Sequence, residues 1–114
     1  MYLDEVINKL GLEILTESKD FSRTPVTGGY ASDLLSCVMS GAKREDVWLT
    51  LQAHINIVAV AALLELSAVI ITENAQPDES TLSKANQQEV TLLSSREDTY
   101  TLAGKLWAMG IGSK

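Results

Sequence analysis

The chain has 114 residues, of which 46% are hydrophobic and 21% are charged, and its formal net charge is −6. This length and composition predict one folded domain over residues 1–114 and exclude a disordered segment. Nine Lys and Arg against fifteen Asp and Glu argue against a nucleic-acid partner, because phosphate neutralisation needs a basic surface. No apolar run approaches the roughly 20 residues of a membrane span. A single cysteine, which allows no internal disulfide, predicts a cytoplasmic location.

The N-terminal quarter predicts a helix, a short strand and a loop. Apolar residues three and four apart predict an amphipathic helix that ends at Gly11. A proline at residue 25 favours extended backbone before it. The elements expected here are, in order, a helix over 3–10, a strand over 12–15, a polar loop over 16–23, an extended segment over 24–27 and a sharp break at Gly28-Gly29.

The middle of the chain predicts two helices and two strands. One helix carries a continuous apolar face from Ala31 to Met39 and is closed by Gly41. A second, over 55–66, begins with β-branched residues, but its alanine- and leucine-rich end favours a helix capped by Asn56. The remaining elements expected here are a charged turn over 43–46 and strands over 47–51 and 69–72.

The C-terminal third continues the alternation. Asp78 is expected to cap a helix through Ala85, and residues 90–93 form a short strand. A capping-box-like sequence over 95–98 then begins a last helix that ends at Gly110. Its expected apolar face consists of Leu102, Ala103, Leu106, Trp107 and Met109. Strands that alternate with helices predict a three-layer α/β/α domain with a mainly parallel sheet of about four to five strands.

One predicted helix is apolar on every side. Residues 57–64 contain no polar side chain, whereas a helix that covers a sheet normally keeps a polar outer face. We therefore expect a second copy of the chain to cover it, which predicts a homodimer. The alternative is that part of this run is a buried strand. The expected interface residues are Ile57, Val58, Val60, Ala61 and Leu64.

Catalytic signatures are absent from the sequence. The Gly104-Lys105 pair lies inside a predicted helix and is not a phosphate-binding P-loop. Cys37, expected to be buried or half-buried, lies away from a helix N-terminus, and no motif joins it to His54, the only histidine. With one Cys and one His, no metal site or cofactor is expected. These observations predict that the chain is not an enzyme.

The Thr27-Gly28-Gly29 sequence is a candidate anion-binding turn. Two glycines before a predicted helix allow close approach of a ligand, and the first helical amides would point at it. The same residues could instead form a tight turn that only serves packing. The candidate ligand-binding residues are Arg23, Thr27, Gly28, Gly29, Ser32 and His54, the last because it follows a predicted strand end.

Several stretches resemble the DRTGG domain family. The spacing Asp20-x2-Arg23-x3-Thr27-Gly28-Gly29 is continued by Tyr-Ala-Ser-Asp-Leu-Leu-Ser. Further similar stretches lie at 46–54, 58–61, 68–71 and 77–79. The resemblance implies an α/β/α domain similar to the N-terminal domain of HPr kinase/phosphorylase. It also implies an assembly and regulatory module, commonly dimeric, that accompanies catalytic domains without being one.

Two functional hypotheses follow. The first is a non-catalytic, homodimeric regulatory module that acts through an unknown protein partner. The second is a sensor that binds a nucleotide or another phosphorylated small molecule at the Thr-Gly-Gly turn. Neither hypothesis involves nucleic acid or a membrane.

Overall fold

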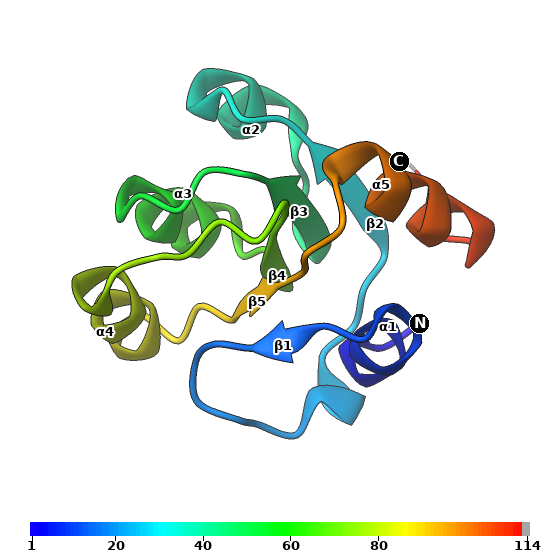
Figure 1. The fold of residues 1–114 in the computed structure, drawn as a ribbon, viewed down its shortest axis with the longest axis horizontal. Coiled ribbons are helices and arrows are strands. Elements are labelled where there is room, and N and C mark those ends of the chain that lie inside the picture. Colours follow the sequence, from blue (N-terminus) through cyan, green and yellow to red (C-terminus); the bar gives the residue numbers. More distant parts are fainter. Residues whose placement is uncertain (113–114) are drawn as a thin grey trace.

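The computed structural model describes residues 1–112. Five helices, five strands and a short 3-10 turn make up these residues (Figure 1). In chain order they are α1 (Leu3–Leu10), β1 (Glu13–Ile14), the 3-10 turn η1 (Phe21–Arg23), β2 (Gly28–Ala31), α2 (Leu35–Gly41), β3 (Asp46–Thr50), α3 (Asn56–Leu64), β4 (Ala68–Ile71), α4 (Glu79–Gln87), β5 (Leu92–Ser94) and α5 (Thr99–Ala108).

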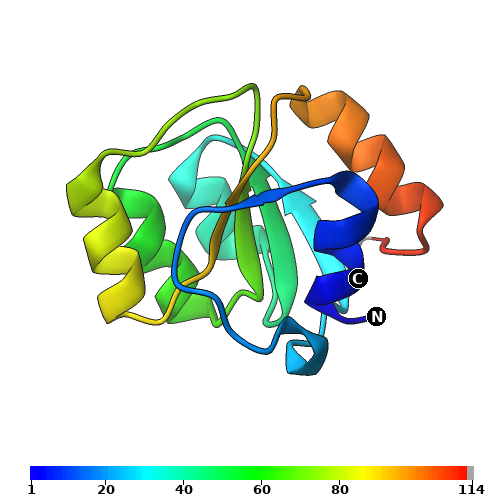
Figure 2. The ribbon, with the colours of Figure 1, turned by 60° about the horizontal axis from the view of Figure 1, so that its bottom comes forward.

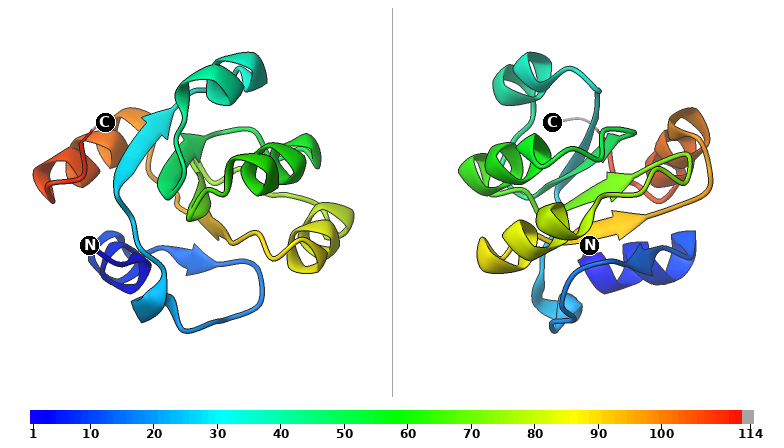
Figure 3. Two further views of the ribbon diagram at one scale, coloured as in Figure 1. Left: turned by 180° about the vertical axis from the view of Figure 1, so that it is seen from behind. Right: turned by 60° about the vertical axis from the view of Figure 1, so that its left-hand side comes forward.

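The strands form one sheet in the order β1-β5-β4-β3-β2. Strands β2 to β5 are parallel, and β1 pairs antiparallel with β5. Each parallel strand adds beside the previous one, so crossovers of constant hand place α2, α3 and α4 on one face of the sheet. The helices α1 and α5 cover the other face (Figures 2 and 3). The predicted three-layer α/β/α fold with a mainly parallel sheet is confirmed.

Side chains of the central strands alternate between two hydrophobic layers. Val47 and Leu49 of β3 pack toward α1 and α5, whereas Trp48 packs toward α2, α3 and α4. Trp48 is fully buried, and its indole Nε1–H donates to the carbonyl oxygen of Ser32 at 2.8 Å. Strands buried on both faces give the continuous apolar runs that the sequence shows at β3 and β4.

Two predicted helix boundaries, the end of α1 and the start of α4, are confirmed. Two other predicted helix starts are wrong. Gly11 ends α1 in the left-handed conformation at φ 61°, and the Asp78 carboxylate caps α4 through the Thr81 N–H. The helix expected from Ala31 begins at Leu35, because Ala31 pairs with β3. The last helix begins at Thr99 and is capped by Asp98, three residues later than the predicted start.

Most of the predicted dimer surface on α3 is buried within this chain. Ile57 and Val58 are fully buried, and Ala61 and Val60 are at most 9% exposed. Leu64 is half-buried and packs against the same hydrophobic layer. Since α3 lies between α2 and α4 above the sheet (Figure 3), the chain itself covers the apolar side chains that a second copy was expected to cover.

Residues 1–112 contain no candidate membrane-spanning helix. No helix there is both long and apolar enough to cross a bilayer. The apolar α3 has nine residues, whereas a span needs about 20.

Candidate functional site at the carboxyl ends of β4 and β5

The chain turns to opposite faces of the sheet after two neighbouring strands. After β4 it continues to α4, and after β5 it continues to α5, so the two connecting segments separate at the top of the view in Figure 2. In open α/β sheets the crevice at such a point is the usual ligand site. A cavity of about 620 Å³ lies here, within the 300–1,000 Å³ range that is typical of small-molecule sites.

Four segments of the chain line this cavity, and most of the lining is polar. The end of α1 and the start of β1 contribute one wall, the β4–α4 segment a second, the end of β5 with its following loop a third, and α5 the last. The lining residues are Leu10, Gly11, Glu13, Asn74, Gln76, Ser94, Ser95, Arg96, Glu97 and Lys105. Hydrogen-bonding side chains of both charges therefore converge on one cavity.

Backbone hydrogen bonds hold the two strand-end loops together. The Glu73 N–H donates to the Glu97 carbonyl oxygen at 2.9 Å, and the Asn74 N–H donates to the Ser95 carbonyl oxygen at 2.9 Å. Glu73 and Asn74 both have φ 57°, in the left-handed region that costs a residue such as Glu73 about 1–2 kcal/mol and that asparagine adopts more readily. The Thr72 and Thr99 hydroxyls, 2.7 Å apart, join the end of β4 to the start of α5.

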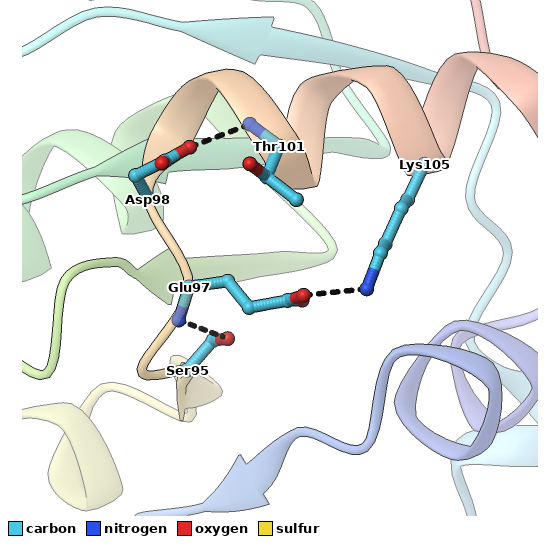
Figure 4. Close-up of polar contacts among 5 residues, drawn as sticks. All are labelled: Ser95, Glu97, Asp98, Thr101 and Lys105. Carbon is cyan, nitrogen blue, oxygen red and sulfur yellow. Dashed lines mark hydrogen bonds and ion pairs between the residues drawn. The ribbon is translucent and has the colours of Figure 1, made fainter.

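The loop after β5 places the Glu97 carboxylate beside the Lys105 ammonium group of α5 (Figure 4). The Glu97 N–H donates to the Ser95 hydroxyl oxygen at 3.1 Å, and this contact fixes the turn. The Lys105 ammonium then donates to Glu97 Oε1 at 2.5 Å. The two side chains are 49% and 34% exposed, so water can exchange with this ion pair and the pair contributes only about 0–1 kcal/mol.

Asp98 begins α5 and orients this wall of the cavity. Its carboxylate accepts the Thr101 N–H at 2.7 Å. The backbone bond from Thr101, and then the bond from its hydroxyl, hold the pKa of Asp98 below its ordinary value of 3.8. The carboxylate form is therefore the one that caps α5, and it fixes the helix that carries Lys105.

The neighbouring strand ends, those of β2 and β3, are closed by internal hydrogen bonds. Asp33 Oδ1 accepts the Thr50 hydroxyl at 2.8 Å and the Leu51 N–H at 2.9 Å. The Thr50 hydroxyl oxygen in turn accepts the Gln52 N–H at 3.1 Å. This carboxylate therefore joins the loops that follow β2 and β3.

The predicted Thr27-Gly28-Gly29 turn is wrong in its geometry. Gly28 and Gly29 form the start of β2, paired with Asp46 and Val47, and neither has a positive φ. The glycines are followed by more strand and not by a helix. The premise of the predicted anion site, free helical amides beside a glycine turn, is therefore absent.

The six predicted ligand-binding residues do not come together. Arg23 lies in η1 and the Thr27 N–H bonds to Glu45 before β3, so both are at the amino end of the sheet. Ser32 and His54 follow the carboxyl ends of β2 and β3. The His54 Nδ1 accepts the Asn56 N–H at 3.1 Å; this bond serves the start of α3, where Asn56 was expected to be the cap.

Sequence reasoning missed the cavity residues although part of the signal was present. Asn74 and Arg96 lie two and three residues after the predicted strands over 69–72 and 90–93, and the rule about strand ends that selected His54 applies equally to them. Cys37, expected to be buried or half-buried, is exposed on α2. Within residues 1–112, no group of three or more His, Cys, Asp and Glu side chains could hold a metal ion.

Comparison with known proteins places the chain in a family. The sequence model of the DRTGG domain matches residues 32–109. The chain belongs to the DRTGG domain family. The match includes the loops after β4 and β5. It begins after Gly29, so the stretch from Asp20 to Gly29, which first indicated the resemblance, lies outside it. No curated protein matches this chain.

A solved structure shares the fold of this DRTGG domain. It is the crystal structure of the CBS and DRTGG domains of the regulatory region of Clostridium perfringens pyrophosphatase, complexed with the activator diadenosine tetraphosphate. The TM-score is 0.71 at 17% sequence identity, and the similarity covers 90% of this chain. This chain spans only 44% of that structure. At this identity the likeness establishes the fold.

Proposed function

We propose that this DRTGG domain is a non-catalytic regulatory domain that binds a nucleotide or another phosphorylated small molecule in the cavity at the carboxyl ends of β4 and β5. The observation that carries the proposal is the convergence of Arg96 and Lys105 on a polar cavity of about 620 Å³ where the loops after β4 and β5 separate. Family membership and the shared fold with a regulatory region that was crystallised with a nucleotide activator support it.

The cavity chemistry fits a ligand that has both anionic and donor groups. The Arg96 guanidinium, which makes no ion pair with residues 1–112, and the Lys105 ammonium suit phosphate oxygens. Glu13 and Glu97 suit hydroxyl or amino donors, such as those of a ribose or a base. Because the Lys105–Glu97 pair is weak and exposed, a phosphate can replace Glu97 at little cost.

A thermal-shift titration with nucleotides and diadenosine tetraphosphate tests this proposal. Saturable binding raises the free energy of unfolding by RT ln(1 + [L]/Kd), about 2.7 kcal/mol at 100 times Kd. We expect Arg96→Ala and Lys105→Ala each to weaken binding about tenfold or more, because each removes a charged hydrogen bond. The matched control is Arg23→Ala, which removes an exposed arginine at the opposite end of the sheet.

The control decides between the two candidate locations. Weaker binding in Arg23→Ala with full affinity in Arg96→Ala would return the ligand to the amino end of the sheet. A flat response to every compound at millimolar concentration would contradict a ligand-binding function. The remaining hypothesis would then be the predicted module that acts as a homodimer through protein partners, on a surface other than α3.

A further inference from the structure

The walls of the cavity at the carboxyl ends of β4 and β5 consist mainly of hydrogen-bonding groups. Eight of its ten lining residues have polar or charged side chains, and the other two are Leu10 and Gly11. Cavities that hold flat apolar ligands are instead lined mainly by hydrophobic and aromatic side chains. The lining of this cavity therefore suits a ligand that carries polar groups over most of its surface.

The aromatic residues of the chain lie away from this cavity. All six fall within residues 1–112, and none of them lines it. Phe21 and Trp48 are buried in the two hydrophobic layers. Trp107, which was expected on the buried face of its helix, is 67% exposed and lines a separate groove beside β2 together with Tyr30. Proteins commonly hold a base by stacking it on an aromatic side chain, whereas the apolar side chain in this cavity is that of Leu10.

The lining side chains offer both hydrogen-bond acceptors and donors. Glu13 of β1 is an acceptor that makes no ion pair within residues 1–112. The Ser95 hydroxyl oxygen accepts the Glu97 N–H at 3.1 Å, so its own O–H remains a donor (Figure 4). Gln76 Nε2 donates to the Asn74 side-chain oxygen at 3.2 Å, which leaves the Asn74 amide N–H groups as donors. A hydroxyl group both donates and accepts, so a ligand with several hydroxyl groups matches this mixture.

The formal charges around the cavity cancel. Arg96 and Lys105 balance Glu13 and Glu97, and the whole chain carries −6. One phosphate group suits the two cations, whereas each further phosphate brings negative charge toward the two glutamates and into the field of an acidic protein. The C-terminal end of α1 forms another wall, and the carbonyl oxygens at such an end carry partial negative charge. The cavity therefore favours one phosphate with hydroxyl donors beside it.

We propose that the ligand of this cavity is a phosphorylated sugar, or a related polyol, with a single phosphate group, and not a nucleotide. This inference rests on the proposed function and narrows its class of ligand. Arg96 and Lys105 bind the phosphate oxygens. Glu13, and Glu97 once the phosphate has replaced it at Lys105, accept hydroxyl groups of the sugar, and the Asn74 amide donates to them.

Three compounds that share one ribose 5-phosphate group test this inference: ribose 5-phosphate itself, AMP and ATP. Calorimetric titration of the full chain without magnesium gives the three Kd values. We expect ribose 5-phosphate to bind at least as tightly as AMP, because the base gains no stacking contact. We expect ATP to bind about tenfold more weakly, because its two further phosphates meet the acidic lining.

A variant of Glu13 tests how the hydroxyl groups are recognised. Glu13→Gln keeps a side-chain oxygen but removes its charge, so it weakens a hydrogen bond from a hydroxyl group. We expect the preference for ribose 5-phosphate over inorganic phosphate, which is the ratio of their Kd values, to fall about fivefold. The matched control is Glu17→Gln, because Glu17 is also exposed but does not line the cavity. This control should leave the ratio unchanged.

The outcomes separate this inference from the proposed function. Binding of AMP or ATP about threefold or more tightly than ribose 5-phosphate, with loss of that binding in Arg96→Ala, would overturn the inference and leave the proposed function standing. The absence of binding by all three compounds would contradict both. An unchanged preference in Glu13→Gln would overturn the assignment of Glu13 to the hydroxyl groups. Circular dichroism of each variant separates lost binding from lost folding.

Discussion

Three helices pack on one face of the sheet and two on the other, and the two faces differ in what they leave open. On the first face α3 lies between α2 and α4, and its apolar side chains are buried by the chain itself. On the second face α1 and α5 come from the two ends of the chain. The cavity with Lys105 lies on one side of α5 and the groove with Trp107 on the other.

The difference follows from topology. Successive parallel strands that add in one direction place their crossover helices side by side, so the first face is filled in order. The second face receives only the helices that precede and follow this unit. The helix α5 borders both openings.

The largest effect is expected within the filled face, on a matched pair of α3 residues. Ile57 is fully buried and Leu63 is 68% exposed on the same helix. Ile57→Ala should lower the free energy of unfolding by about 2–5 kcal/mol, whereas Leu63→Ala should change it by less than about 0.5 kcal/mol. Urea denaturation at fixed protein concentration measures both. Equal effects of the two changes would contradict the burial of α3 by α2 and α4.

The elements that sequence predicted best are those with local signals. The apolar spacing of α1 with Gly11 behind it, and the Asp78 cap before α4, require no knowledge of distant residues. Gly28 and Gly29 were misread because their strand conformation depends on pairing with Asp46 and Val47. Local propensity favours a turn at a glycine pair, and a non-local ladder overrides it here.

The candidate site could be predicted only in part for the same reason. Asn74 and Arg96 are placed by the ends of β4 and β5, which the sequence located to within a few residues. Lys105, Leu10 and Gly11 reach the cavity only because α1 and α5 cover the same face of the sheet. The choice of face is a property of the whole topology. The same limit explains α3, whose apolar surface identifies a buried helix but not what buries it.

A smaller effect is expected where helices of the two faces end. Gly11 after α1 has φ 61° and ψ 42°, and Glu65 after α3 has φ 55° and ψ 47°. In this left-handed conformation, Gly11→Ala should lower the free energy of unfolding by about 1–2 kcal/mol, with no clash to add because its Cβ would meet nothing within 4 Å.

Glu65→Gly should act in the opposite direction and raise the free energy of unfolding by up to about 1 kcal/mol. It also removes the ion pair with Arg44 at 3.5 Å. Both side chains are about 70% exposed, so this loss offsets little of the gain. Chemical denaturation measures the two variants together. A lower free energy of unfolding in Glu65→Gly would show that the Glu65 side chain stabilises the fold through contacts other than its ion pair with Arg44.

The smallest effect concerns the two capped helices and their dependence on pH. Hydrogen bonds from Thr81 and Ser80 lower the pKa of Asp78 on α4, and those from Thr101 lower the pKa of Asp98 on α5, both from 3.8. A carboxyl whose pKa is lower in the folded state stabilises the fold fully above its unfolded pKa. This stabilisation is lost as the pH falls through the folded pKa.

Asp78→Asn and Asp98→Asn should therefore lower the thermal midpoint near neutral pH, and the difference from wild type should shrink below about pH 4. Asp78 accepts from the Thr81 N–H, the Thr81 hydroxyl and the Ser80 hydroxyl, whereas Asp98 accepts from Thr101 alone. We expect the larger pH dependence at Asp78, on the filled face. A larger pH dependence at Asp98 would mean that its carboxylate stabilises other parts of the cavity wall in addition to the start of α5.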